Sequence, residues 1–315
     1  MNIANTTILY NLNENLALVA RDAGGANILA SLCRKHSLSP KIAVQGPAAD
    51  IFHLLSLKTN SIDLSNIDKN TKLIISGTSE INSLEIEALE IAKQMNIYSI
   101  SFLDHWSNYR SRFENNGKLL LPDEIWVGDK HAYAKAIKDF PKELVRYCKN
   151  PYFEEILSEI RYIELNSNLK NNQTLHPNDE PLILYLTEPA GKFAKNFDLV
   201  DGIIPYDEFT ALDYFLIRMK KRYPNIRKLR IRLHPSESFE KYRKFFSGHT
   251  NFNFSLSRQS LAADICASDI IVGTNSMGLV ISSLAGKISI SAIPPKGFPC
   301  VLPFSGVQKI DDFWI

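Results

Sequence analysis

The chain has 315 residues, 45% of them hydrophobic, which is enough for two domains of ordinary size with a core each. Its 36 basic and 34 acidic residues are interspersed and leave a net charge of +2, which gives little support to a nucleic-acid-binding protein. The polar stretch 1–15 lacks the apolar core of a secretory signal, and no stretch is apolar enough to span a bilayer. We therefore expect a cytoplasmic protein; peripheral contact with the inner membrane and the oligomeric state stay open.

Short apolar runs of strand length alternate with helical segments in the first half of the chain. The clearest helix is 82–95, where apolar residues repeat at helical spacing and glutamates form the polar side. A shorter helix covers 129–139 and ends before Pro141. The alternation predicts βαβ units around a parallel sheet. The expected strands are 16–20, 41–44, 72–76, 97–102 and 125–128.

The polar, Asn-rich stretch 166–181 follows an expected helix at 151–165 and is interpreted as a linker. A second βαβ series follows it. Its expected strands are 182–186, 228–233, 269–272 and 288–292, and its expected helices are 204–223, 257–267 and 276–285. We predict an α/β fold of two Rossmann-like doubly wound domains, residues 1–165 and 182–315, that face a central cleft.

Residues 269–278 run from a buried-strand pattern through a hydroxyl-rich turn into an apolar helix. Thr274, Asn275 and Ser276 are good N-cap residues, and the free N–H groups and positive dipole end of a helix start attract anions. This pattern predicts a site for the phosphate of a nucleotide or sugar phosphate. It has the spacing of neither a P-loop nor a dinucleotide-binding fingerprint, so a purely structural junction is the alternative.

The loop after the first strand contains Arg21, Asp22, Gly24 and Gly25. The glycines permit a tight turn and a close approach of a ligand to the backbone, and Asp22 is placed to act as a general base on a sugar hydroxyl. The alternative is that Asp22 only caps the following helix and that the glycines only relieve crowding.

The loop after the fourth strand is rich in ionisable and aromatic residues. These are Asp104, His105, Trp106, Tyr109, Arg110, Arg112 and Phe113. The aromatic rings offer faces to sugars, the arginines offer forks to carboxylate or phosphate, and Asp104 beside His105 is a candidate proton-transfer pair. The alternative is a protein contact in which Trp106 and Phe113 are simply buried.

In the second half, Thr187 and Glu188 follow the first strand, and His234 follows the strand 228–233. Pro235 holds His234 extended, where its imidazole can donate to a nucleotide phosphate and, when protonated, offset charge on a leaving phosphate. The other histidines and the cysteines lack metal-ligand spacing, and no Asp-x-Asp motif occurs. No metal site is therefore predicted. Helix N-termini and the side chains of His and Arg would stabilise the negative charge of the phosphate.

Two of these motifs carry a resemblance to a known family. His234-Pro235 is similar to the His-Pro motif, and Thr274-Asn275-Ser276 to the Ser/Thr motif, of bacterial sialyltransferases and related capsule or lipopolysaccharide enzymes of the GT-B glycosyltransferase architecture. The resemblance covers the architecture of nearly the whole chain but only about half a dozen specific residues. Where the family has a paired acidic-acidic-Gly motif with its base, this chain has Arg21-Asp22-Ala23-Gly24.

The resemblance implies an inverting, metal-independent transferase without a further cofactor. Such an enzyme moves a nonulosonic acid from a CMP-activated donor to a glycan or lipid-linked acceptor. The first domain would bind the acceptor and the second the nucleotide sugar. Asp22 or Asp104 would take the acceptor proton, and His234 with the helix start at 274–276 would stabilise the leaving nucleotide. The donor carboxylate would pair with Arg21, Arg110 or Arg112.

Three other functions stay open from the sequence alone. A UDP-sugar 2-epimerase or nucleotide-sugar hydrolase shares the architecture and a Ser-bearing loop of this kind. A nucleotide-sugar or glycan-binding module would use the Trp106 loop for recognition without turnover. A periplasmic-type binding protein also has two domains, but the missing export signal speaks against it.

Overall fold

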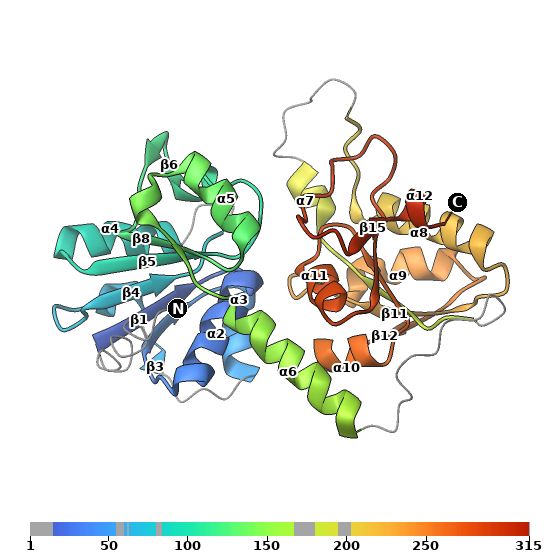
Figure 1. The fold of residues 1–315 in the computed structure, drawn as a ribbon, viewed down its shortest axis with the longest axis horizontal. Helices are drawn as coiled ribbons and strands as arrows, with labels where there is room; N and C mark the ends of the chain where they lie inside the picture. The colour runs from blue at the N-terminus through green and yellow to red at the C-terminus, as the bar shows by residue number, and fades with distance from the viewer. Residues whose placement is uncertain are drawn as a thin grey trace. The chain divides into compact units, whose positions relative to one another are not determined.

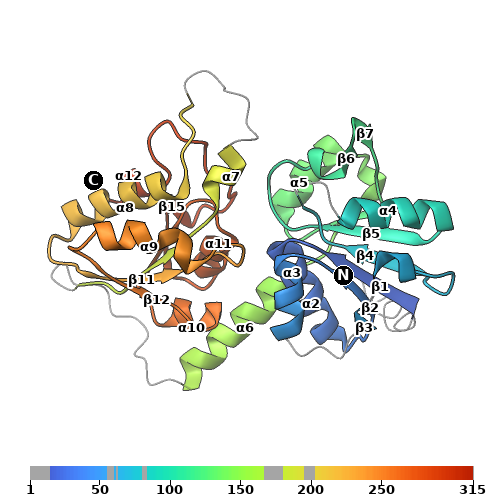
Figure 2. The ribbon, with the colours of Figure 1, turned by 180° about the vertical axis from the view of Figure 1, so that it is seen from behind.

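The computed structural model describes residues 15–54, 60–61, 63–79, 84–166, 180–194 and 203–314 (Figures 1 and 2). The chain divides into two compact units, residues 1–155 and 156–315, and the division falls within helix α6 (Pro151–Asn166). The predicted linker 166–181 lies outside the described residues except at 166, 180 and 181.

The first unit contains a seven-stranded, fully parallel sheet in the order β3-β2-β1-β4-β5-β8-β9. Its strands are β1 (Leu16–Ala20), β2 (Lys41–Val44), β3 (Asn60–Ser61), β4 (Leu73–Ser76), β5 (Tyr98–Leu103), β8 (Glu124–Val127) and β9 (Val145–Tyr147). A separate antiparallel pair joins β6 (Glu114–Asn115) to β7 (Lys118–Leu119).

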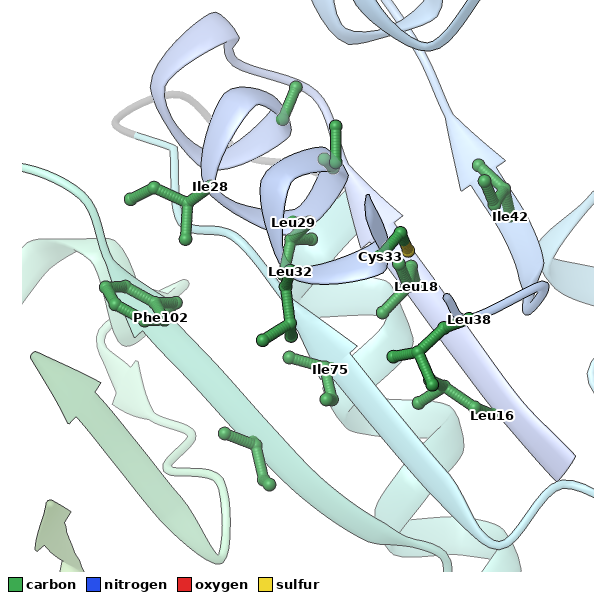
Figure 3. Close-up of a cluster of buried hydrophobic side chains, with 14 of the residues drawn as sticks. Leu16, Leu18, Ile28, Leu29, Leu32, Cys33, Leu38, Ile42, Ile75 and Phe102 are labelled. Atoms are coloured by element: carbon green, nitrogen blue, oxygen red, sulfur yellow. The ribbon is translucent and has the colours of Figure 1, made fainter. Parts of the chain in front are cut away.

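Helices cover both faces of this sheet because its strands are apolar on both sides. Side chains alternate between faces along a strand, so Leu16 and Leu18 of β1 belong to the cluster with α2, whereas Ala17 and Val19 belong to the cluster with α4. Figure 3 shows the α2 cluster, in which Leu32 lies beside Ile75 of β4. The helices of this unit are α2 (Ala23–His36), α3 (Pro47–Leu54), α4 (Leu84–Met95) and α5 (Lys130–Asp139).

The second unit contains a six-stranded parallel sheet in the order β12-β11-β10-β13-β14-β15. Its strands are β10 (Ile183–Leu186), β11 (Lys228–Arg232), β12 (Asn253–Leu256), β13 (Ile270–Gly273), β14 (Ile288–Ser291) and β15 (Val307–Lys309). Its helices are α7 (Ala190–Ala194), α8 (Glu208–Arg222), α9 (Phe239–Gly248), α10 (Leu261–Cys266), α11 (Met277–Leu284) and α12 (Ile310–Phe313). Helices α8 and α12 pack on the face that carries Ile183 and Tyr185.

Both sheets have the Rossmann strand order, in which the first strand lies inside the sheet and the chain reverses direction beside it. The prediction of two Rossmann-like α/β domains is therefore confirmed. The reversal falls between β1 and β4 in the first unit and between β10 and β13 in the second. Ligands of doubly wound proteins bind at the carboxyl ends of the strands at this position.

Two glycines allow the loops at the first reversal point to touch. A Cβ atom on Gly25 would lie 2.9 Å from the Cα of Gly77, and one on Gly77 would lie 3.0 Å from the Cα of Gly25. The start of α2 therefore lies against the loop after β4, and a side chain at either position would push the loops apart. The predicted close approach at Gly25 is thus to the protein's own backbone.

Some helices begin later than predicted because side chains cap them. Asp207 accepts a hydrogen bond from the Thr210 N–H (2.7 Å), so α8 begins at Glu208 rather than at 204. Ser260 accepts one from the Ala263 N–H (3.2 Å), so α10 begins at Leu261 rather than at 257. The short edge strands β3, β9, β12 and β15 were not predicted. Within the described ranges, no helix is long and apolar enough to cross a membrane.

Candidate functional site

In the second unit, hydrogen bonds join the loops that follow β10, β11 and β13. The His234 N–H donates to Thr187 Oγ1 (3.0 Å), which connects the loops after β11 and β10. The Asn275 N–H donates to Glu188 Oε2 (2.7 Å), which connects the loops after β13 and β10. The residues predicted at the nucleotide site of this domain are thus gathered at the carboxyl edge of one sheet.

The carboxylate of Glu188 lies where the sequence pattern predicts a phosphate. Its Oε2 atom accepts hydrogen bonds from the Asn275 N–H and from the Thr274 hydroxyl. Burial raises the pKa of Glu188 to about 7; the two hydrogen bonds oppose this shift, and the nearby Glu237 adds to it. Two donors of the predicted cradle are therefore occupied by a side chain of the protein that changes charge near neutral pH.

The remaining polar groups of the 274–276 turn hold its shape. Asn275 Oδ1 accepts from the Val301 N–H (2.8 Å), and the Ser291 hydroxyl donates to the Thr274 carbonyl (2.7 Å). Ser276 is the N-cap of α11, since its hydroxyl oxygen accepts from the Gly278 N–H (3.2 Å). In the described part of the chain, the N–H groups of Ser276 and Met277 have no acceptor, so they remain available to an anion.

His234 is held as a neutral hydrogen-bond donor. Its Nδ1 atom accepts from the Ser236 N–H (3.1 Å) and lies 2.8 Å from the Ser236 hydroxyl, so the proton of the neutral ring is on Nε2. Burial lowers the pKa of His234; Glu237 opposes the shift, and Lys192 and Lys241 add to it. Pro235, next to it, is exposed.

A buried carboxylate, which was not predicted, supports this edge. Glu237 accepts from the Thr187 hydroxyl (2.6 Å), from the Tyr242 hydroxyl (2.9 Å) and from Lys241 Nζ (2.6 Å). Lys241 also pairs with Glu208 at the start of α8. The charge of this lysine is therefore shared by two carboxylates, and it contributes little net positive potential to the site.

In the first unit, Asp22 occupies the N-cap position of α2 without acting as a cap. Its backbone is extended (φ −84°, ψ 152°), but its side chain makes no hydrogen bond to the helix start. Burial raises the pKa of Asp22 to about 6; Asp104 and Glu85 add to this shift, and Arg112 and Arg21 oppose it. The alternative role as a helix cap is excluded, and the carboxylate is left as a base that titrates just below neutral pH.

Asp104, the second candidate base, is occupied by an ion pair. Arg112 Nη1 lies 3.0 Å from Asp104 Oδ1, and the side chains are 5% and 10% exposed. The Thr78 hydroxyl also donates to Asp104 Oδ1 (3.3 Å), and the same hydroxyl accepts a hydrogen bond from Arg112 Nη1 (3.1 Å). Arg112 is thus a structural partner of Asp104, whereas Asp22 forms no ion pair within the described part of the chain.

The aromatic residues of the loop after β5 are part of the core. Trp106 is 4% exposed, and its indole N–H donates to Asp129 Oδ2 (2.7 Å), while Asp129 also caps α5. Tyr109 and Phe113 are each 1% exposed. The rings are buried, as the alternative held, but against residues of their own unit, such as Asp129 and Phe140, so their burial requires no interdomain or oligomer contact. Neither Trp106 nor Tyr109 offers a ring face to a ligand in this conformation.

The other predicted substrate contacts have local partners. Arg110 is exposed and pairs with Glu114 (3.0 Å), four residues later at the start of β6. His105 Nδ1 lies 3.0 Å from the Ser107 hydroxyl. The backbone N–H of Arg21 donates to Glu85 Oε1 (2.8 Å), which fixes the chain just before Asp22. A substrate-binding role for these residues, and for Gly24, stays a prediction.

No family model matches the sequence, and no curated protein sequence matches it. Solved structures do resemble the fold. A UDP-N-acetylglucosamine 2-epimerase from Rickettsia bellii superposes with a TM-score of 0.56 at 13% identity, covering 88% of this chain and 78% of that one. A Listeria monocytogenes protein proposed to be the same kind of epimerase gives 0.50 at 9% identity, covering 89% and 79%.

A third similar structure is MurG from Acinetobacter baumannii, with a TM-score of 0.48 at 11% identity, covering 92% of this chain and 80% of that one. At identities this low, the likeness to the Rickettsia structure concerns the fold alone. The activity of this chain has to be inferred from its own residues.

Replacing Asp22 by Asn should stabilise the protein at alkaline pH. A carboxyl whose pKa is higher in the folded than in the unfolded state costs stability as pH rises from its unfolded to its folded pKa, and the full cost is present above the folded pKa. We expect Asp22→Asn to raise the free energy of unfolding by about 3 kcal/mol at alkaline pH, with the gain shrinking as pH falls from about 6 to about 4. Urea unfolding at several pH values measures this.

The exposed Asp50 on α3 provides the matched control. It lies in the first turn of that helix, so Asp50→Asn should lower stability by no more than about 1 kcal/mol and should not raise it at alkaline pH. A loss of stability in Asp22→Asn at all pH values would instead assign Asp22 a structural role.

Proposed function

We propose that this chain is a glycosyltransferase that moves a nonulosonic acid from a CMP-activated donor onto a glycan or lipid-linked acceptor in surface polysaccharide synthesis. The observation that carries the proposal is the state of Asp22, which lies at the ligand-binding edge of a Rossmann-like sheet. Its carboxylate does not cap the following helix, and its pKa is about 6. Such a group suits the removal of a proton from an acceptor hydroxyl near neutral pH.

The nucleotide would bind to the second unit through neutral donors. These are the Nε2–H of His234 and the N–H groups at the start of α11, with the hydroxyl of Ser276. A CMP-activated sugar has one phosphate and a UDP-activated sugar has two. Glu188 already places a carboxylate here, and the charge of Lys241 is shared by two other carboxylates. The single phosphate of a CMP-activated donor is therefore favoured at this site over the more highly charged diphosphate of a UDP-activated donor.

The reaction would break the bond between the anomeric carbon and the phosphate oxygen, and the deprotonated acceptor hydroxyl would form the new bond from the opposite face. This inverts the anomeric centre. His234 would donate a hydrogen bond to the departing CMP and thereby stabilise its developing charge. We assign no metal to the proposed reaction because the chain has no Asp-x-Asp motif.

The second candidate function is that of a UDP-sugar 2-epimerase, because the fold resembles the epimerase structure from Rickettsia bellii. Such an enzyme would bind a UDP-sugar and require no acceptor. The nucleotide that binds therefore separates the two candidates.

A thermal-shift screen with CMP, CDP, UDP, GDP and ADP tests the choice of nucleotide. A ligand that binds only the folded state raises the free energy of unfolding, by about 2.7 kcal/mol at a concentration of one hundred times Kd, and so raises the unfolding temperature. We expect CMP to raise the unfolding temperature of the wild type most, and His234→Ala to reduce the shift. A response to UDP alone would contradict the proposal and favour the epimerase.

Glu188 should make nucleotide binding depend on pH. Its carboxylate competes with the ligand phosphate at this turn, because it occupies the Asn275 N–H and the Thr274 hydroxyl and its charge repels a phosphate bound at the neighbouring donors. Affinity should therefore rise as pH falls through about 7 and Glu188 becomes neutral. A cytidine 5′-phosphodiester is a suitable ligand because its phosphate does not titrate in this range. We expect Glu188→Gln to bind it with roughly tenfold higher affinity at alkaline pH and without this pH dependence.

Calorimetric titration across the pH range measures both effects. Glu240→Gln is the control, since Glu240 is exposed and pairs only with Arg243 among the described residues. Weaker binding by Glu188→Gln at all pH values would show that Glu188 accepts hydrogen bonds from the ligand rather than competing with it.

A further inference from the structure

The turn between α8 and β11 concentrates positive charge. The segment 220–228 contains the basic residues Lys220, Lys221, Arg222, Arg227 and Lys228. No acidic residue occurs between Asp213 and Glu237. In a chain whose net charge is only +2, this is a local excess that the rest of the sequence does not show.

None of these basic side chains has an ion-pair partner among the residues that the structure places. Other cations of the chain do have one. Arg34 binds Glu155, Arg112 binds Asp104, and Arg232 binds Asp264. No carboxylate among the described residues therefore neutralises the five charges of the turn.

Two of the cations lie close to each other. Lys220 Nζ and Arg227 Nη1 both donate to the carbonyl oxygen of Pro224, the latter at 3.0 Å. Like charges that share one acceptor repel each other, and an anionic surface beside them would relieve that repulsion. Lys221, Arg222 and Lys228, which flank them, are exposed.

An apolar side chain accompanies the charges. Ile217 is 69% exposed and lies one helical turn before Lys221, so both project from the same face of α8. Cations beside an exposed aliphatic side chain suit a lipid headgroup region, where the apolar group can enter the acyl boundary. Nucleic acid would offer no such environment to Ile217.

We propose that the turn 220–228, together with Ile217, docks on the surface of a bilayer that contains anionic phospholipid. The turn leads into the first residue of β11, whereas the nucleotide groups follow the last residues of β10, β11 and β13. Docking would therefore leave the carboxyl edge of this sheet open to a water-soluble ligand. The inference does not depend on the proposed reaction.

Co-sedimentation with vesicles tests the proposal. At low ionic strength we expect the wild type to bind phosphatidylcholine vesicles that contain about one third phosphatidylglycerol, and to be released at about 0.5 M salt. Each cation near such a surface contributes roughly fivefold to the partition coefficient. The triple variant Lys221→Gln, Arg222→Gln, Arg227→Gln should therefore bind on the order of 100-fold more weakly.

The matched control removes the same charge from the first unit, through Lys130→Gln, Lys138→Gln and Lys142→Gln at exposed positions of α5 and the turn after it. This variant should bind as the wild type does. Ile217→Ser should weaken vesicle binding while leaving binding to a short RNA unchanged. Unfolding temperatures of all variants show whether they are folded.

Three outcomes would overturn the proposal. These are failure of the folded wild type to bind the anionic vesicles at low salt, equal binding by the wild type and the triple variant, and binding of the wild type to RNA but not to vesicles.

Discussion

In a sheet of parallel strands, all carboxyl ends meet at one edge, and this constraint decides which residues of the chain can act together. In the first unit it places Asp22 beside the loops that carry Thr78 and Asp104. In the second unit it places Glu188, His234 and the start of α11 within one hydrogen-bonded group. Each of these groups draws on segments that are far apart in the sequence.

The carboxylates at these edges differ in how their charge is balanced. Asp104 faces Arg112, and Glu237 faces Lys241. Among the described residues, neither Asp22 nor Glu188 forms an ion pair with a cation, and for both of them burial raises the pKa, to about 6 and about 7. An unpaired, partly buried carboxylate costs folding energy, and such groups concentrate at functional sites. The roles proposed for Asp22, as the base, and for Glu188, as the group that makes nucleotide binding depend on pH, rest on this difference.

The central strands and the fold class could be predicted because apolar runs and helical spacing are local properties of the sequence. The observed β1 and β2 coincide with the predicted ranges 16–20 and 41–44. The state of the candidate residues could not be predicted, because it depends on distant partners. Glu188 meets Asn275 across 87 positions of sequence, and the pKa of Asp22 depends on Glu85 and Asp104, which other elements bring near.

Two parts of the site could have been anticipated more fully. Arg112 follows Asp104 by only eight positions, so a local ion pair was a reasonable expectation. Glu237 and Lys241 have the i,i+4 spacing of a helical ion pair. Nothing in the spacing, however, shows that Glu237 would be buried and would bind Thr187 across the sheet edge.

The pH dependence of sugar transfer from a CMP-activated nonulosonic acid tests the central claim, that Asp22 is the general base, most directly. For the wild type, kcat/KM should rise as pH rises through about 6, because the base must lose its proton. In Asp22→Asn this ascending limb should vanish with most of the activity, while CMP binding is retained. An unchanged profile in Asp22→Asn, or loss of the limb in Asp104→Asn alone, would contradict the account.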